Sequence, residues 1–444
     1  MPGKLLSWPD WPEFSEKNAE LSNDLTEYKK AIVDRYGEAN LTKSWLKTCH
    51  ELSRVTEEMA SLGTDYIPTV AYEDMSSLSP EEKRRLKDIG CFKVKEVIPR
   101  KQADQLFRDL KTYVSENKSS ITGWPKETPF IHNLYFSPSQ ITARSHPNIL
   151  ELSKELNSWW LEGEPDASIS RPLSYADGVR IRPPGVPFFG LGPHIDAGSL
   201  ARWTDPIYQS VYSAIFSGHP EDLDCYDLSL RKDANQAMFP GNAHSTVFRS
   251  FQGWTALSPA APGEGSLMLY PNVKWSISYL LLRPFFKTPA NSGHVMDASK
   301  WTFDPATPWF PGTWKSDSQL LSPSSHPHLR LKECMVSIPA MEPGDTIWWH
   351  ADMCHAVEVE HNGEHEACVA YIAATPSTEQ NKKYMKQQVE NFLNGKAPPD
   401  FECEGLSSER EFEGFTGEQS MLSGDEGRRA FGFDLLGQDT AVAA

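Results

Sequence analysis

Three histidines in this sequence are followed, two positions later, by a carboxylate. The pairs are His194–Asp196, His219–Glu221 and His350–Asp352. An imidazole and a carboxylate at this spacing can share one metal ion, although the same pattern also occurs at ordinary polar turns. His219 lies in the acidic stretch GHPEDLDC, where solvated charge explains it. His194 and Asp196 lie in GLGPHIDAGSLARW, and these small and apolar neighbours favour a metal site.

A site built from two histidines and one carboxylate needs a further ligand from another strand. The candidate segment is PGDTIWWHADMCHAVE, residues 343–358, in which TIWWH has the composition of a strand and His355 begins the next one. Both His350 and His355 are available as ligands. Five positions separate them, which would place them on opposite faces of one continuous strand. They are therefore not expected to bind the same metal ion.

Short strands must position these ligands. Between Tyr175 and about Thr375, runs rich in β-branched and aromatic residues alternate with proline and glycine turns, as in GVRIRPPG, STVFRSFQGWTALSP, GSLMLYP and ACVAYIAATP. This spacing predicts a sandwich or a barrel. Two long inserts, residues 204–242 and 284–327, interrupt the pattern. The second insert is a candidate lid, and its tryptophans are expected to pack it against the protein: Trp301, Trp309 and Trp314.

Helices are expected on both sides of this β-rich region. Residues 13–62 carry leucines and aromatics at helical spacing. Ser79, Pro80 and Glu82 have the residue types of a helix start, and Gly90 ends that helix before the strand CFKVKEVI. Further helices are expected from Pro99 to Leu110, from Ile149 to Trp160, and in KKYMKQQVENFL. The predicted parts are a helical extension over residues 1–75, a core over residues 76–376, and a C-terminal helix and tail over residues 377–444.

The bulk composition argues against several classes of protein. The chain has 444 residues and a formal net charge of −17, which argues against binding to nucleic acid or to an anionic membrane surface. Its seven scattered cysteines include no CxxC pair, so neither a disulfide framework nor a cysteine zinc site is expected. The sequence shows no signal peptide and no apolar run of about 18 residues. We therefore expect a cytoplasmic protein that acts on a small molecule.

Several segments resemble one superfamily of enzymes. The spacing of Gly344–Asp345, His350 and His355 is similar to the distal-histidine stretch of phytanoyl-CoA-dioxygenase-like enzymes. LSPEEKRRLKDIGCFKVKEVIPRKQADQL is similar to the helix, strand and helix that precede their barrel. LGPHIDAGSLARW, FRSFQGWTALSPAAPGEGSLMLYP and GDTIWWHADMCHAVE together resemble a bacterial and fungal branch, over roughly residues 75–435. The resemblance implies an α+β fold built on a double-stranded β-helix, a jelly-roll or cupin-like barrel, with flanking helices and long inserts.

The resemblance also implies a chemistry. Enzymes of this superfamily use Fe(II), 2-oxoglutarate and O2 to oxidise unactivated C–H bonds. The second histidine of their distal stretch binds iron, which selects His355 over His350 as the partner of His194 and Asp196. Fungal members of the branch oxidise small amino acids in secondary metabolism, by hydroxylation or by oxidative ring closure such as aziridine formation. No catalytic side chain is expected beyond the metal ligands.

The sequence departs from this superfamily where the distal carboxylate of 2-oxoglutarate should bind. Phytanoyl-type enzymes carry an arginine about ten to fifteen residues after the distal histidine, but VEVEHNGEHEACVAYIAATP contains no arginine or lysine. A cation from another strand must then replace it. Arg249 in VFRSFQGW is the first candidate and Arg182 the second, with an ordinary surface salt bridge as the alternative for each. The candidates for substrate binding are Arg180, Gln252 and Trp348.

Two other functions fit the same residues. A jelly-roll protein with a decayed site would bind a ligand without catalysis, although the intact set of metal ligands argues against this. The missing arginine would also suit an Fe(II) oxidase that needs no 2-oxo acid. Iron content distinguishes the first alternative, and succinate formation distinguishes the second.

Overall fold

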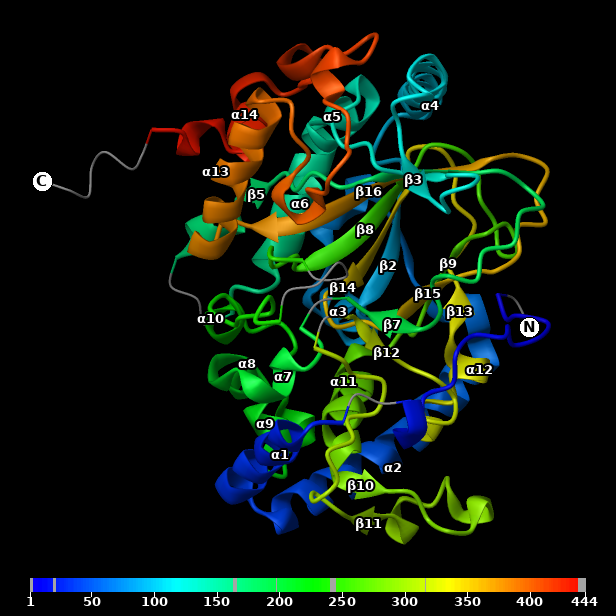
Figure 1. Cartoon of the computed structure of the whole chain (residues 1–444), viewed down its shortest axis with the longest axis vertical. Coiled ribbons are helices and arrows are strands. Elements are labelled where there is room, and N and C mark those ends of the chain that lie inside the picture. Colours follow the sequence, from blue (N-terminus) through cyan, green and yellow to red (C-terminus); the bar gives the residue numbers. More distant parts are fainter. Residues whose placement is uncertain are drawn as a thin grey trace, which may run out of the picture.

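The structure, a computed structural model, describes residues 3–18, 21–162, 166–196, 198–239, 245–315 and 317–437. A large β-sheet lies near the centre, and helices gather on both sides of it (Figure 1). No helix within the described ranges combines the length and the apolar character needed to cross a membrane.

The N-terminal region is helical, as the sequence predicts. Helix α1 spans Asn23–Tyr36 and helix α2 spans Glu38–Leu62. Helix α2 packs against α11, Val273–Leu282, and both contribute to one hydrophobic core. The same core includes Ile195 and Met268 of the β-rich region. The N-terminal helices therefore share a core with the strands that follow them.

Local signals determine the next elements. Ser79 and Glu82 form the predicted capping box of α3, Pro80–Ile89, in which each residue's backbone N–H donates to the other's side chain. Gly90 ends the helix with a φ of 80°, in the left-handed region that favours glycine. The chain then enters strand β2, Cys91–Lys95. This part of the fold can be predicted from the sequence because each signal comes from residues that are close together in the chain.

Strand β2 belongs to a nine-stranded sheet. Its other strands are β1 (Thr69–Ala71), β3 (Gly123–Trp124), β4 (Ile131–His132), β5 (Pro172–Leu173), β6 (Val179–Arg182), β8 (Phe251–Ala256), β14 (Thr346–His350) and β16 (Ala367–Pro376). The order is β1-β2-β14-β8-β16-β6-β4-β3, and β5 pairs with β16. Strands β1 and β2 run parallel, and the other described pairs are antiparallel.

A five-stranded sheet, also antiparallel, has the order β12-β7-β15-β9-β13. Its strands are β7 (His194–Ile195), β9 (Leu267–Leu269), β12 (Gln319–Leu320), β13 (Val336–Ser337) and β15 (His355–Val357). From β6 to β9 and from β14 to β16, the chain passes back and forth between the two sheets. A separate hairpin pairs β10 (Phe286–Lys287) with β11 (Thr302–Phe303).

Alternation along the large sheet sorts its side chains between two cores. Trp254 and Trp349 pack with Leu267 and other residues of the five-stranded sheet. Phe251 and Trp348 belong to a different core, which residues of the covering helices complete. The mixed α+β class predicted from the sequence is confirmed. The described strands form open sheets, so strand pairing by itself does not define a closed barrel.

The remaining helices cover the sheets and occupy the inserts. They are α4 (Arg100–Glu116), α5 (Pro138–Arg144), α6 (Pro147–Ser158), α7 (Ala201–Thr204), α8 (Pro206–Val211), α9 (Ser213–Phe216), α10 (Leu228–Arg231), α12 (Leu331–Cys334), α13 (Glu379–Leu393) and α14 (Gly424–Phe431). Helices α8 to α10 lie in the first long insert. Short 3-10 turns join several of these elements.

The second long insert, residues 284–327, is held down by aromatic contacts. The ring centroids of Trp301 and Trp45 of α2 are 5.1 Å apart, and those of Trp314 and Phe14 are 5.4 Å apart. The predicted packing of these two tryptophans is confirmed. Because β12 pairs with β7, the end of the same insert lies directly beside His194. Its role as a lid stays a prediction.

Candidate metal centre

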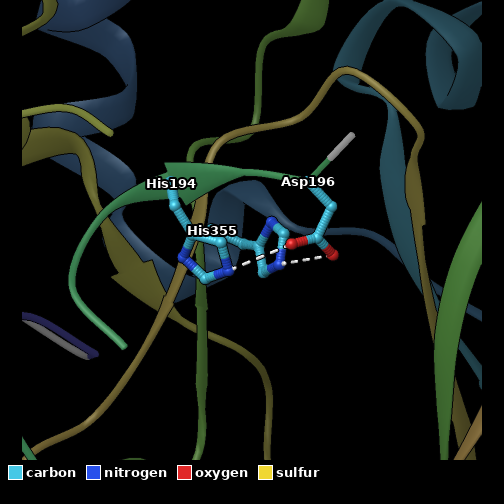
Figure 2. A group of neighbouring side chains, drawn as sticks. All are labelled: His194, Asp196 and His355. Carbon is cyan, nitrogen blue, oxygen red and sulfur yellow. Dashed lines mark ion pairs between the residues drawn. The ribbon is translucent and has the colours of Figure 1, made fainter. Parts of the chain in front are cut away.

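Two neighbouring strands of the five-stranded sheet bring the predicted metal ligands together. His194 begins β7 and His355 begins β15, and the antiparallel register places these two residues opposite each other. Asp196 follows His194 by two positions, so its side chain returns to the same face of the chain. Figure 2 shows the two imidazoles and the carboxylate pointing towards one another.

The ligand atoms are close enough for one metal ion to contact all of them. His194 Nε2 lies 3.4 Å from Asp196 Oδ1, and His355 Nε2 lies 3.6 Å from Asp196 Oδ2. One ligand atom from each residue lies within 4.8 Å of the other two. The imidazole centroids are 4.2 Å apart. This is the arrangement of a two-histidine, one-carboxylate site with its remaining face open.

Backbone carbonyls orient both imidazoles. His194 Nδ1 lies 2.8 Å from the Gly192 carbonyl oxygen, and His355 Nδ1 lies 3.1 Å from the Met353 carbonyl oxygen. A carbonyl oxygen only accepts, so in the neutral rings Nδ1 carries the proton and Nε2 keeps its lone pair. Both Nε2 atoms face the Asp196 carboxylate. A bound metal ion would take their lone pairs, and without one the Nε2–H of protonated His194 can donate to Asp196. A bond from the distant ring nitrogen to a backbone carbonyl is the usual support of a metal-binding histidine.

The electrostatics of the three side chains also suit a cation. Burial alone would raise the pKa of Asp196, but the bond to His194 and the nearby His355 and Arg249 hold that pKa below its usual range. Burial and the neighbouring His194 lower the pKa of His355 to about 4. Burial also opposes protonation of His194, yet the bond to Asp196 raises its pKa overall. A charged carboxylate beside a neutral imidazole fits a divalent metal ion.

Two cavities meet at these ligands. The inner cavity, about 220 Å³, lies between the sheets, and its wall includes Gln252, Trp254, Leu267, Trp349 and Tyr371. The outer cavity, about 560 Å³, has a wall that includes Trp11, Phe14, Asp317, Leu321 and Asp400. His194, Asp196 and Arg249 line both cavities. A molecule in either cavity can therefore reach the open face of the site.

The other two histidine–carboxylate pairs lie elsewhere. His350 is buried in the helix-covered core, where its ring stacks on Trp160 with centroids 4.8 Å apart and its Nε2 lies 2.9 Å from the Cys225 carbonyl oxygen. His219 is exposed beside two carboxylates, as its acidic surroundings predict. Of the two histidines that competed as the distal ligand, the structure brings His355 to His194 and leaves His350 in the core.

Arg249 lies at the metal centre, on the segment just before β8. Its guanidinium is 3.7 Å from Asp196 Oδ2 and 3.8 Å from Asp177 Oδ2, and it lies over the ring of Tyr175. Only 13% of its side chain is exposed. The sequence placed Arg249 on the strand itself, but β8 begins at Phe251. Its two carboxylate neighbours already balance its charge.

The other two candidate arginines share one face of β6, as alternation requires, but differ in their partners. Arg182 donates to the carbonyl oxygens of Glu358 and Val186, at 2.7 and 2.9 Å, and to that of Val359. Like Arg180, it is not among the described residues that line either cavity. These bonds give Arg182 a structural role and argue against the predicted contact with a co-substrate. Arg180 is as deeply buried, but its nitrogens have no partner among the described residues.

The predicted contact between Trp348 and the substrate requires a correction. Trp348 lies in the helix-covered core with its Nε1 donating to Thr346 Oγ1, and its neighbour Trp349 lines the inner cavity. The ring centroids of Trp349 and His355 are 5.3 Å apart. Gln252 lines the inner cavity, and its predicted contact with a substrate stays a prediction. Tyr371 also lines this cavity, but it was not among the residues predicted from the sequence. Alternation along β16 could have indicated that its side chain faces the interior.

Comparisons with known proteins agree on one family. Residues 19–433 match the model of the Gig2-like family. The uncharacterized protein YbiU of Escherichia coli K12 is 30% identical over 388 residues, which cover 83% of this chain and 86% of that protein.

Two solved structures show the same overall fold. The Candida albicans protein GIG2 is 29% identical, with a TM-score of 0.81 over 93% of this chain and 90% of its own. A Salmonella typhimurium LT2 protein with the provisional name of an oxidoreductase is 26% identical, with a TM-score of 0.77 over 92% of this chain and 96% of its own. The chain belongs to the Gig2-like family.

Proposed function

We propose that this protein is an Fe(II)/2-oxoglutarate-dependent oxygenase whose iron is bound by His194, Asp196 and His355. The observation that carries the proposal is the convergence of two oriented Nε2 atoms and one carboxylate where two cavities meet. Two imidazoles and a carboxylate bind Fe(II) and leave positions open on one face for further ligands. With a 2-oxo acid and O2, Fe(II) bound there would supply the oxidation of an unactivated C–H bond.

The path of the chain supports a double-stranded β-helix as the scaffold. Strands β6, β8, β14 and β16 lie in the large sheet, and β7, β9 and β15, which alternate with them along the chain, lie in the five-stranded sheet. Side chains from both sheets fill the space between them. Such alternation between two facing sheets is how a jelly roll is built. The metal ligands then come from adjacent strands of one sheet, at the mouth of the enclosed space.

The protein's own residues would position and shield the reaction. The carbonyls of Gly192 and Met353 hold both imidazoles in the metal-binding tautomer. His194, His355 and, to a smaller extent, Arg249 favour the ionised form of the Asp196 carboxylate. Trp349 covers one side of His355 and, with the other apolar walls, excludes water from the inner cavity. The inner cavity would hold the co-substrate, and the outer cavity would hold the substrate.

The outer cavity suits a small zwitterion. Its wall carries the Arg249 guanidinium and the carboxylates of Asp177, Asp317 and Asp400. A substrate carboxylate can pair with a guanidinium, and a substrate ammonium can pair with a carboxylate. An amino acid, oxidised by hydroxylation or by ring closure, is therefore the substrate class that we propose.

Anaerobic addition of 2-oxoglutarate to the Fe(II)-loaded protein is expected to produce a weak visible absorption band, because a 2-oxo acid that chelates Fe(II) accepts charge from it. With O2 and substrate, succinate should appear in proportion to the oxidised product. Absorption spectroscopy and mass spectrometry of the products measure these two results. The His355→Ala protein is the control, and it should show neither. Oxidation at an equal rate without a 2-oxo acid would favour an Fe(II) oxidase, and a protein that takes up no iron would favour a binding protein.

A further inference from the structure

Arg180 of β6 is a buried cation with no ion pair or hydrogen bond to any described residue. The residue is 1% exposed, and none of its guanidinium nitrogens has a hydrogen-bond partner among the described residues. The guanidinium lies 4.4 Å from the centroid of the Trp254 ring, and this contact offsets part of the cost of its burial. An arginine stays charged in proteins, and an unpaired buried charge is strongly destabilising. An anion is therefore the expected partner of Arg180.

The strand register and the contact with Trp254 place Arg180 directly behind the wall of the inner cavity, at the end away from the candidate metal centre. Trp349 lies beside His355, and Trp254 and Tyr371 pair across β8 and β16 as the next part of the cavity wall. Arg180 pairs with Val369, which precedes Tyr371 by two positions and shares its face of β16. Along the interior, the order is thus metal ligands, then the Trp254–Tyr371 pair, then Arg180.

The neighbouring arginines already have polar partners. Arg249 is already close to the carboxylates of Asp196 and Asp177. Arg182 occupies the next inward position on β6 and donates to backbone carbonyls, including that of Glu358. Within the described part of the chain, only Nε of Arg182 has no partner, whereas all three guanidinium nitrogens of Arg180 can donate to a ligand.

We propose that Arg180, together with the hydroxyl of Tyr371, binds the distal carboxylate of 2-oxoglutarate. This inference rests on the proposed function and assigns the cation that the segment after His355 lacks. A guanidinium offers two parallel N–H groups to a carboxylate, and a carboxylate buried in this interior would be costly without such a partner. The 2-oxo end of the same molecule would lie at the metal centre, with Trp254 and Tyr371 beside its methylene groups. Arg249 is then left to act on Asp196 and on the substrate.

The decisive experiment compares Arg180→Met with Arg182→Met in the Fe(II)-loaded full-length chain without O2. The visible band reports the affinity for 2-oxoglutarate, and thermal unfolding reports stability. Arg180→Met should bind Fe(II) normally and keep or raise the Tm, but weaken 2-oxoglutarate by about 100-fold, because a charge-assisted bidentate contact is lost. Arg182→Met should lower the Tm, because backbone carbonyls lose their donors, and should leave the affinity of the folded protein within about threefold.

A ligand control tests the same point without mutation of the protein. 2-Oxopentanoate has the chain length of 2-oxoglutarate but no distal carboxylate. The wild-type protein should prefer 2-oxoglutarate by about 100-fold, and Arg180→Met should bind the two compounds about equally. Arg180→Lys should recover only part of the preference, because lysine offers charge without the paired N–H groups.

Each outcome decides between named alternatives. Wild-type affinity for 2-oxoglutarate in Arg180→Met, or in Arg180→Lys if the methionine variant does not fold, overturns the inference. Loss of the preference in Arg249→Met instead would assign the carboxylate to Arg249. A wild-type protein that binds Fe(II) but shows no affinity for 2-oxoglutarate overturns the proposed function, and this inference with it. A wild-type protein that binds both 2-oxo acids equally overturns the inference alone.

Discussion

Alanine at His355 is expected to abolish Fe(II) binding, whereas alanine at His350 should leave Fe(II) binding intact in the folded protein. His355 supplies one of three ligand atoms, and its loss should lower Fe(II) affinity by at least about 100-fold. His350 contacts Trp160 and the Cys225 carbonyl in a separate core. Its replacement should cost about 2–4 kcal/mol of stability through a cavity and a lost hydrogen bond.

Anaerobic Fe(II) titration and thermal unfolding of both variants measure these effects independently. His194→Ala and Asp196→Ala serve as positive controls, and each should lose Fe(II) as His355→Ala does. The assignment of the distal ligand would be wrong if His350→Ala lost iron while His355→Ala kept it. If all of these variants bound Fe(II) like the wild-type protein, the metal would bind elsewhere.

The choice between these two histidines shows how far the sequence could be read. Alternation along a single strand predicted that His350 and His355 would not share a metal ion. The structure does separate them, but for a different reason: β14 ends at His350 in the large sheet, and β15 begins at His355 in the other sheet. The sequence pattern predicted the turn between the two histidines, but it did not predict that the strands on either side belong to different sheets. That change depends on pairing with β7 and β9, which lie far away in the chain.

Helices and strands were predicted well where residues close together in the chain define their ends. The capping box at Ser79 and the glycine at position 90 place both ends of α3. The helix Val273–Leu282 was not predicted, because its sequence VKWSISYLLL is buried on nearly all sides and shows no amphipathic period. Strands were recognised by composition, but their partners were not. For this reason the α+β class could be predicted and the arrangement of the sheets could not.

The residues of the candidate site show the same limit. Alternation predicts that Trp348 and Trp349 point in opposite directions, but only pairing with β8 decides which one reaches the cavity. It also predicts that Arg180 and Arg182 share a face. Two of the carbonyls that bind Arg182 come from residues after β15, so the sequence could not show that Arg182 has several partners and Arg180 has none among the described residues.

Asp352 belongs to the same kind of sequence motif as Asp196 but forms a buried cluster with cations. Its Oδ1 lies 2.9 Å from Arg231 Nη2 and 3.4 Å from Arg202 Nη2. Its Oδ2 lies 3.0 Å from Arg231 Nη1 and from the Tyr212 hydroxyl. The two arginines hold the pKa of Asp352 well below its usual range against the effect of burial. These contacts tie the first insert to the turn that leads from β14 to β15.

Asp352→Asn is expected to destabilise the protein by about 3–5 kcal/mol, because it leaves two buried guanidinium groups without their counter-charge. Its folded fraction should still bind Fe(II).

Asp196→Asn should do the opposite, with a much smaller loss of stability and weakened Fe(II) binding, since Asp196 lies at the cavity and acts through the metal. Glu221→Gln, at the exposed third motif, should change stability by less than about 0.5 kcal/mol and leave Fe(II) binding unchanged. Denaturant unfolding and Fe(II) titration of the three variants test this separation. Equal loss of iron in Asp352→Asn and Asp196→Asn would show that the cluster and the metal centre act as one unit.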